Sequence, residues 1–199
     1  MKKLLLIATV VVFGFTANAQ DENTTGGFAK GDVYASGTVG FNSAKQDEAK
    51  SNAFTFSPSV GYFINDNIAL EATLIVGSNK IENGGPEEKT TSFGGGLGAT
   101  YFFTPANQFS FTLGAGVSYV NSKSEIDVAD TDDEKVNTFA IAVAPGINYF
   151  VSDCIALRAS IGALSYASSK ADFDGAEALN TFGLNLDLSD INFGVTYKF

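Results

Sequence analysis

The chain has no histidine, no tryptophan and one cysteine among its 199 residues. Without histidine it cannot form a Ser-His-Asp or Cys-His catalytic group or a histidine metal site. Paired carboxylates or a serine with a lysine remain open by composition, but no motif marks them. Cys154 cannot form an intramolecular disulfide, and we interpret it as an incidental residue in a short turn rather than a reactive or dimer-forming thiol. From the sequence we therefore expect a protein that is not an enzyme and that binds no cofactor.

Basic residues and long apolar runs are also scarce. Twelve lysines and arginines stand against 22 acidic residues. Nucleic acid is therefore not an expected partner, because binding its phosphates requires a basic surface. Beyond the N-terminal segment, no uninterrupted apolar run is long enough for a spanning helix. Any membrane crossing must then use strands, because only closed barrels satisfy the strand backbone within lipid.

The N-terminal segment has the three parts of a secretory signal peptide. Lys2 and Lys3 precede an apolar run over 4–15, and Ala17-Asn18-Ala19 forms a small-x-small cleavage site. We predict a signal peptide over 1–19, a short periplasmic tail over 20–30 and one domain over 31–199. An uncleaved anchor is the alternative, but the apolar run is shorter than a spanning helix needs. Gln20 provides no cysteine for lipid attachment.

The mature chain alternates apolar and polar residues throughout. At its end Ile191, Phe193, Val195, Tyr197 and Phe199 are apolar or aromatic, and the residues between them are polar or glycine. The same period predicts eight strands, an even number as in bacterial single-chain barrels, at about 31–43, 53–64, 67–78, 91–103, 108–121, 137–151, 154–166 and 180–199. The sequence therefore predicts an all-β protein, an eight-stranded antiparallel up-and-down transmembrane β-barrel.

The predicted connections alternate in length. Tight turns at 65–66, 104–107 and 152–153 belong to the periplasmic rim, whereas long charged loops face the exterior, at 44–52, 79–90, 122–136 and 167–179. The last strand changes the parity of its apolar residues between Leu188 and Ile191. One extra residue at Ser189 or Asp190 would restore the face, which predicts a β-bulge there.

Aromatic residues gather at both predicted rims. Four tyrosines have outward parity at the periplasmic ends of returning strands, as an interfacial girdle requires: Tyr62, Tyr101, Tyr149 and Tyr197. Six more aromatic residues fall near the outer rim: Phe41, Phe54, Phe93, Tyr119, Phe139 and Phe182. Two aromatic rims favour a membrane barrel over a soluble fold.

With its signal peptide, eight alternating strands and terminal Tyr197-Lys198-Phe199, the chain resembles the small outer-membrane barrels of the OmpA/OmpX type. The resemblance covers the mature chain and concerns architecture more than function. It implies location in the bacterial outer membrane, contact with its lipid, and recognition of Tyr197 and Phe199 in the C-terminal strand by the barrel-assembly machinery. The periplasmic domain that follows the barrel in OmpA-like proteins is missing, so a role in cell-wall tethering is not expected.

Glu71 and Arg158 are the candidate lumen residues. They occupy matching positions in two similar hairpins and have inward parity on the third and seventh strands, which face each other across the lumen. We predict an ion pair or small polar network that fills the interior. The alternative is a selectivity gate, as charged rings provide in true pores.

The long loops carry fourteen acidic residues and seven lysines by this assignment. An extracellular ligand or cation could bind there, and the acid-rich segment 122–136 is the candidate for Ca²⁺. Its spacing does not match an EF-hand, so a solvated acidic loop is the simpler interpretation.

These features predict a non-enzymatic barrel with a closed, side-chain-filled lumen and a structural or surface-interaction role. The alternative is a narrow porin-like channel or a carrier for small or apolar solutes, which would need an open lumen or a lateral gap. A secreted, soluble eight-stranded barrel of the lipocalin kind is a third possibility. The two aromatic rims and the terminal phenylalanine argue against it.

Overall fold

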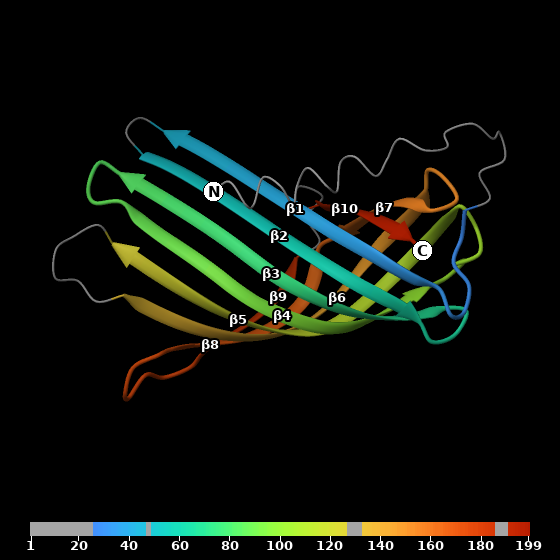
Figure 1. The fold of residues 1–199 in the computed structure, drawn as a ribbon. Coiled ribbons are helices and arrows are strands. Elements are labelled where there is room, and N and C mark those ends of the chain that lie inside the picture. Colours follow the sequence, from blue (N-terminus) through green and yellow to red (C-terminus); the bar gives the residue numbers. More distant parts are fainter. Residues whose placement is uncertain (1–25, 47–48, 127–132, 186–190) are drawn as a thin grey trace.

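The computed structural model describes residues 26–46, 49–126, 133–185 and 191–199. Over these residues it forms one antiparallel sheet of ten strand segments (Figure 1). The segments are β1 (Val33–Gln46), β2 (Ala49–Phe63), β3 (Ile68–Asn83), β4 (Glu88–Phe102), β5 (Phe109–Ile126), β6 (Glu134–Phe150), β7 (Ile155–Ile161), β8 (Ala163–Ala171), β9 (Leu179–Asn185) and β10 (Ile191–Lys198). No helix in the described part of the chain is long and apolar enough to cross a membrane. The predicted signal peptide lies outside the described residues.

The sheet closes on itself as an eight-stranded barrel. Successive strands from β1 to β6 pair as hairpins, and β10 pairs with β1 from Tyr34–Lys198 to Thr38–Gly194. The seventh barrel strand consists of β7 and β8, which pair with the two halves of β6. The eighth consists of β9 and β10. The predicted fold class is confirmed.

Most of the large apolar residues of the strands point outward. Phe111 is 61% exposed, whereas its neighbours Ser110 and Thr112 are buried in the interior, and Phe193 is 67% exposed. A soluble domain would place these side chains the other way round. An outward apolar surface around a polar interior is stable only if lipid surrounds it.

The strands continue farther toward the outer end than the sequence predicted. β1 reaches Gln46, β3 reaches Asn83 and β5 reaches Ile126, so much of each segment predicted as a long loop is strand. Inward polar side chains bond across the ladder there, with Thr90 to Ser124 at 2.9 Å as one example. These hydrogen bonds and the continued backbone ladder support the strands beyond the apolar band.

The seventh barrel strand contains an interruption that the sequence analysis missed. Gly162, at a φ of 62°, separates β7 from β8, and the outward parity changes from odd to even across it. Pro145 of β6 lies opposite the break and has no N–H to donate to a ladder, which favours a bulge at this height.

The predicted bulge in the eighth strand, at Ser189 or Asp190, lies outside the described residues. On either side of it, Ile161 pairs with Ile191 and Ala163 with Asn185.

Candidate functional site

An aromatic floor fills the end of the barrel that carries the short turns. Its rings are all at most 2% exposed and come from Phe28, Tyr34, Phe63, Phe102 and Phe150. Phe28 lies at the centre, with its ring centroid 4.6 to 5.5 Å from the other four. Its backbone N–H donates to the Pro105 carbonyl at 2.7 Å. Part of the predicted periplasmic tail thus lies inside the barrel.

A repeated dipeptide builds this floor. Tyr62-Phe63, Tyr101-Phe102 and Tyr149-Phe150 each end a returning strand, and strand alternation turns every tyrosine outward and every phenylalanine inward. The fourth returning strand has Tyr197-Lys198 instead. The Lys198 ammonium donates to the Gly27 carbonyl at 2.6 Å and lies 5.6 Å from the centre of the Phe150 ring. The tyrosines were predicted from the sequence, whereas the inward phenylalanines were not.

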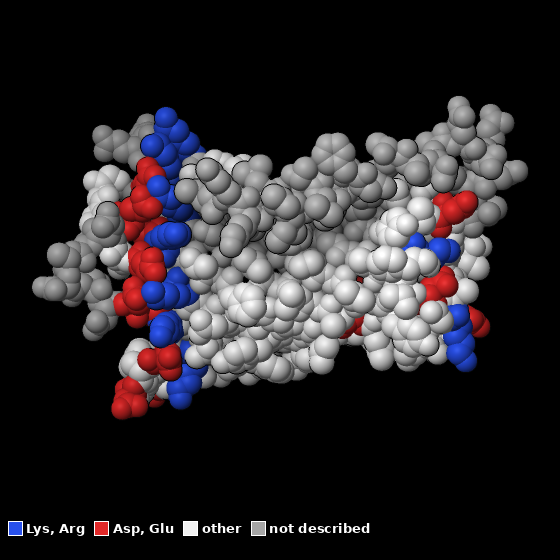
Figure 2. All heavy atoms as spheres, viewed as in Figure 1, with Lys and Arg blue, Asp and Glu red and all other residues white. Residues whose placement is uncertain are grey.

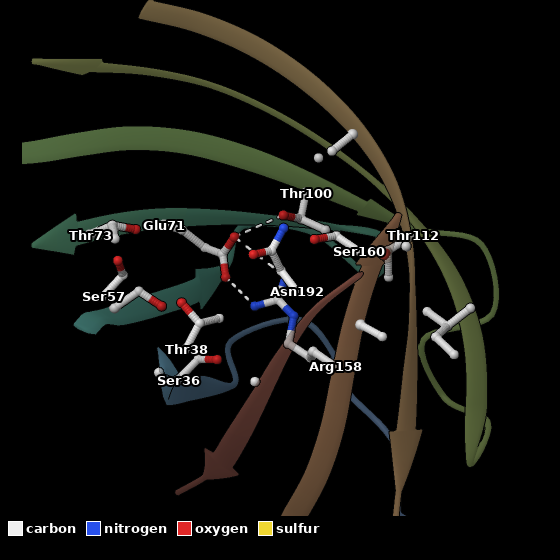
Figure 3. Close-up of a pocket in the computed structure, with 18 residues that line it drawn as sticks. Ser36, Thr38, Ser57, Glu71, Thr73, Thr100, Thr112, Arg158, Ser160 and Asn192 are labelled. Carbon is white, nitrogen blue, oxygen red and sulfur yellow. Dashed lines mark hydrogen bonds and ion pairs between the residues drawn. The ribbon is translucent and has the colours of Figure 1, made fainter. Parts of the chain in front are cut away.

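Glu71 and Arg158 meet directly above the floor, on opposite walls of the lumen (Figure 3). The Arg158 guanidinium forms a two-point contact with both Glu71 carboxylate oxygens. The same carboxylate accepts hydrogen bonds from the Tyr34 hydroxyl at 2.7 Å and the Thr100 hydroxyl at 2.8 Å. Tyr34 and Thr100 were not predicted as members of this network. The half-buried Glu71 carboxylate therefore accepts hydrogen bonds from three side chains, which satisfies its oxygens.

Glycines beside Glu71 make room for this network. Gly61 and Gly98 are its cross-strand neighbours on β2 and β4. A Cβ atom on Gly61 would lie 2.0 Å from Cζ of Tyr34, so the Tyr34 ring occupies the space that a side chain would need. The glycine lets the hydroxyl of Tyr34 reach Glu71.

A cavity of about 250 Å³ lies above the ion pair. Figure 3 shows hydroxyl and amide side chains around it from several strands, among them Ser36, Thr38, Ser57, Thr73 and Asn192. Glycine and alanine occupy much of the remaining wall. The lumen is therefore filled at one end and hollow above it, which refines the prediction of a side-chain-filled interior.

The barrel wall is incomplete beside the upper part of this lumen. The β1–β10 ladder ends at Thr38 and Gly194. Among the described residues, no ladder joins the outer half of β1, from Val39 to Gln46, to β9. β9 pairs with β8 alone. β9 thus belongs to the sheet through β8 and is not joined to β1.

The remaining predicted site residues lie on the outer surface. The four tyrosines are 41 to 50% exposed, and each pairs with a residue at the start of an outgoing strand, at the same end of the barrel as the floor. Phe199 is 74% exposed; its ring centroid lies 5.2 Å from that of Tyr197 and its N–H donates to the Val33 carbonyl. Cys154 is a half-buried free thiol in a turn.

The family model of the outer membrane protein beta-barrel domain matches residues 7–199. The chain belongs to this family. It lies in the bacterial outer membrane, embedded in lipid, and is a small barrel of the OmpA/OmpX type. No curated protein matches the chain.

Several solved structures of outer-membrane proteins match the chain. OprG from Pseudomonas aeruginosa is 15% identical, with a TM-score of 0.54, and the match covers 89% of this chain and 99% of OprG. The N-terminal β-barrel domain of Pseudomonas aeruginosa OprF is 17% identical, with a TM-score of 0.47 and coverage of 86% and 100%. Ail from Yersinia pestis is 13% identical, with a TM-score of 0.44 and coverage of 85% and 99%. At 15% identity the likeness to OprG concerns the fold alone.

Within the described part of the chain, no three acidic residues gather as a group that could hold a metal ion. Asp127, Asp130 and Asp132 of the candidate Ca²⁺ segment lie outside the described residues. The described residues thus form a packed aromatic floor, a polar cavity above it and a wall in which β1 and β9 are not joined.

Proposed function

We propose that the protein is a non-enzymatic outer-membrane scaffold that does not conduct ions and makes contacts at the cell surface. The aromatic floor is the observation that carries this proposal. Five rings and the Glu71–Arg158 network fill the lower lumen, and the rings are at most 2% exposed. Interiors of eight-stranded barrels are just wide enough for side chains to fill. An aqueous path would need these groups to leave their packed positions.

Planar-bilayer recording of the purified barrel tests the seal. We expect no conductance steps from the wild type. The variant with both Phe28→Ala and Phe102→Ala removes two adjoining rings of the floor and should admit ions. Phe93→Ala, which removes a ring on the lipid-facing side of β4, is the matched control and should remain silent. Steady conductance of the wild type would contradict the proposal.

We propose that the protein contacts its partners at the cell surface through the outer ends of the strands and the connections between them. Most of the acidic residues lie there, and binding function commonly resides on segments that a rigid frame positions. Protease treatment of intact cells should remove the outer connections and abolish binding of a partner or a cation while the barrel stays folded. A shaved barrel that still carried a solute or turned over a substrate would place the function inside the lumen instead.

A carrier for small apolar solutes is the second candidate function. The missing ladder between the outer half of β1 and β9 favours it, because a solute could pass from the cavity into the lipid without crossing the floor. Uptake of an apolar dye into proteoliposomes separates the two functions. The scaffold predicts the rate of protein-free vesicles, whereas a carrier predicts faster, saturable uptake.

We also propose that segment 1–19 is removed during export and that Tyr197 and Phe199 are read by the barrel-assembly machinery. N-terminal sequencing of the membrane-inserted protein tests the first, with Gln20 as the expected first residue. Deletion of Phe199 should slow assembly in cells without destabilising barrels refolded in detergent. Retention of Met1, or equal defects in both assays, would contradict these assignments.

A further inference from the structure

A ring of lysines encircles the outer part of the barrel. In Figure 2 it is the blue belt, with acidic side chains on its outer side and the largely uncharged wall on the other. The ring has one residue on each of β1 to β6 and one on β8: Lys45, Lys50, Lys80, Lys89, Lys123, Lys135 and Lys170. The sequence analysis had placed all seven in loops, whereas every one lies on a strand.

The outward face repeats one order of residue types on all seven strands. An exposed apolar residue is followed two positions farther out by serine, threonine or asparagine, and four positions out by lysine. β1 shows this as Phe41, Ser43 and Lys45, and the returning β4 shows it in reverse. The apolar position is aromatic on six strands and Val76 on β3. The order therefore follows height above the apolar band, not direction along the chain.

Acidic residues continue the same order two positions beyond each lysine. The described ones are Glu82, Glu87, Glu125, Asp133 and Asp172, and the sequence has Asp47 and Glu48 at the same spacing. If the charges served only to pair with each other, either order would do. Instead lysine is nearer to the apolar band on all seven of these strands. The order indicates a negative partner at the level of the lysines.

The ladder register sets lysines directly against each other. Three cross-strand pairs consist of two lysines: Lys45 with Lys50, Lys80 with Lys89, and Lys123 with Lys135. Like charges at directly opposite positions destabilise a sheet. An anion held between the two ammonium groups would remove this repulsion.

The protein's own carboxylates neutralise the ring only in part. Lys80 forms ion pairs with Glu82 at 3.1 Å and with Glu87 at 2.7 Å. Lys89, Lys135 and Lys170 are exposed and form no ion pair with a described carboxylate. These three lysines remain open to an external anion, and exposed ion pairs elsewhere in the ring are weak enough to exchange partners.

The ring lies at the height of lipid headgroups. Four residues of strand span about 13 Å, which a tilt near 40° reduces to about 10 Å above the outer aromatic residues. The headgroup region occupies about 5–8 Å on each side of the hydrocarbon core, and a lysine stem can bend back toward it. We propose that the lysine ring binds the phosphate groups of the phosphorylated glycolipid in the outer leaflet.

Native mass spectrometry of the detergent-solubilised barrel tests this proposal with bisphosphorylated lipid A as the probe. Lipid A lacking its phosphates, with the same acyl chains, is the first control, and phosphatidylglycerol is the second. We expect at least tenfold preference for the bisphosphorylated probe over both, decreasing with salt because exposed charges are screened. Equal binding of the first two lipids would overturn the proposal, as would equal binding of phosphatidylglycerol.

Three variants separate lipid binding from pairing within the protein. The first changes Lys89, Lys135 and Lys170 to Gln and should lose the preference; the second changes them to Arg and should keep it. The third exchanges three lysines of the ring with the acids beyond them: Lys80→Glu with Glu82→Lys, and likewise at 123 and 125 and at 170 and 172. This variant preserves the net charge and the possible ion pairs, but places the acidic residue nearer to the apolar band than the lysine. Circular dichroism verifies that each barrel is folded.

The exchange variant is the decisive one. Loss of the phosphate preference by at least tenfold supports the lysine ring as a lipid-binding surface. Full retention would show that the order of the two charges has no role, and would overturn the proposal. β9 lacks the pattern, with Ala178 four positions beyond Phe182, so Ala178→Lys should strengthen binding and a decrease would count against the model of a ring.

Discussion

The two halves of this barrel share the same strands but have opposite interiors. Toward the short turns, large side chains such as Phe63 and Phe102 fill the lumen completely; toward the outer end, small hydroxyl residues and glycines leave a cavity. The wall differs as well, because β10 pairs with β1 below while β9 stays apart from it above. The lower half resembles a soluble protein core enclosed by a sheet, and we expect it to provide most of the stability.

The largest expected effect tests the charged centre of the lower half. Arg158→Gln leaves the Glu71 carboxylate without its cation and should lower the free energy of unfolding by about 3–5 kcal/mol, and Glu71→Gln similarly, whereas the double variant should lose less. Denaturant titration in micelles measures all three. Thr73→Ala, two residues above Glu71 on β3, is the upper-half control and should be nearly neutral. Strictly additive effects would mean that the two charges do not interact.

Removal of a ring from the floor should rank next. Phe102→Ala deletes a fully buried side chain and should cost about 3–4 kcal/mol, through lost burial and the void left behind. Phe93→Ala on the same strand removes a ring of the lipid-facing side that is 64% exposed in the bare protein, and should cost much less in detergent. The same titration compares them. Equal losses would show that the floor has no special share in stability.

The assignment of lipid-facing and lumen-facing residues can be tested at Val143 and Ala142 of β6. Val143 has outward parity, so Val143→Arg places a cation in lipid and should cost about 2–4 kcal/mol near the midplane. Ala142→Ser faces the lumen and should be mild. Urea titration in micelles measures the free energy of unfolding of both variants. Similar losses at both positions would refute the assignment of the faces.

Two lumen glycines compare the packing of the halves directly. Gly61→Ala would force the Tyr34 ring off Glu71 and should cost about 1–3 kcal/mol by overpacking. Gly40→Ala, in the upper half of β1, would bring its Cβ no closer than 3.7 Å to Thr55 and should leave stability almost unchanged. Thermal unfolding followed by circular dichroism compares the pair. A larger loss at Gly40 would reverse the proposed difference.

The smallest effect concerns pH at the outer strand ends, beyond the membrane. Hydrogen bonds from Lys80 and Lys50 lower the pKa of the Glu82 carboxyl below its usual value. Such a group stabilises the folded state above its unfolded-state pKa and loses that contribution as pH falls through the folded-state pKa. Amide hydrogen exchange of β2 and β3 near residues 50 and 82 should therefore show less protection at pH 3 than at pH 6, after correction for intrinsic rates. Glu82→Gln should remove this difference, and its persistence in the variant would exclude Glu82 as the cause.

Much of this architecture could be predicted from residue order alone. A strand turns alternate side chains to opposite faces, so the period of two places Phe109 and Phe111 outward and Ser110 inward without knowledge of any neighbour. The same parity brought Glu71 and Arg158 to opposite walls. The strand ends were predicted short because charged residues were assigned to loops, whereas backbone pairing continues through them.

The sequence by itself determined the barrel, its location in the outer membrane and the two faces of each strand. These features depend on the local alternation of apolar and polar residues, and on the fact that lipid can cover an apolar outer surface. Only the tertiary structure decided what lies across from what. Phe28 packs in the centre of the floor, the Tyr34 hydroxyl donates to Glu71 across Gly61, and lysines of adjacent strands lie side by side. These contacts depend on the register of paired strands and on closure of the barrel, which bring together residues far apart in the chain. No local sequence pattern predicts which residues of two strands will lie opposite each other.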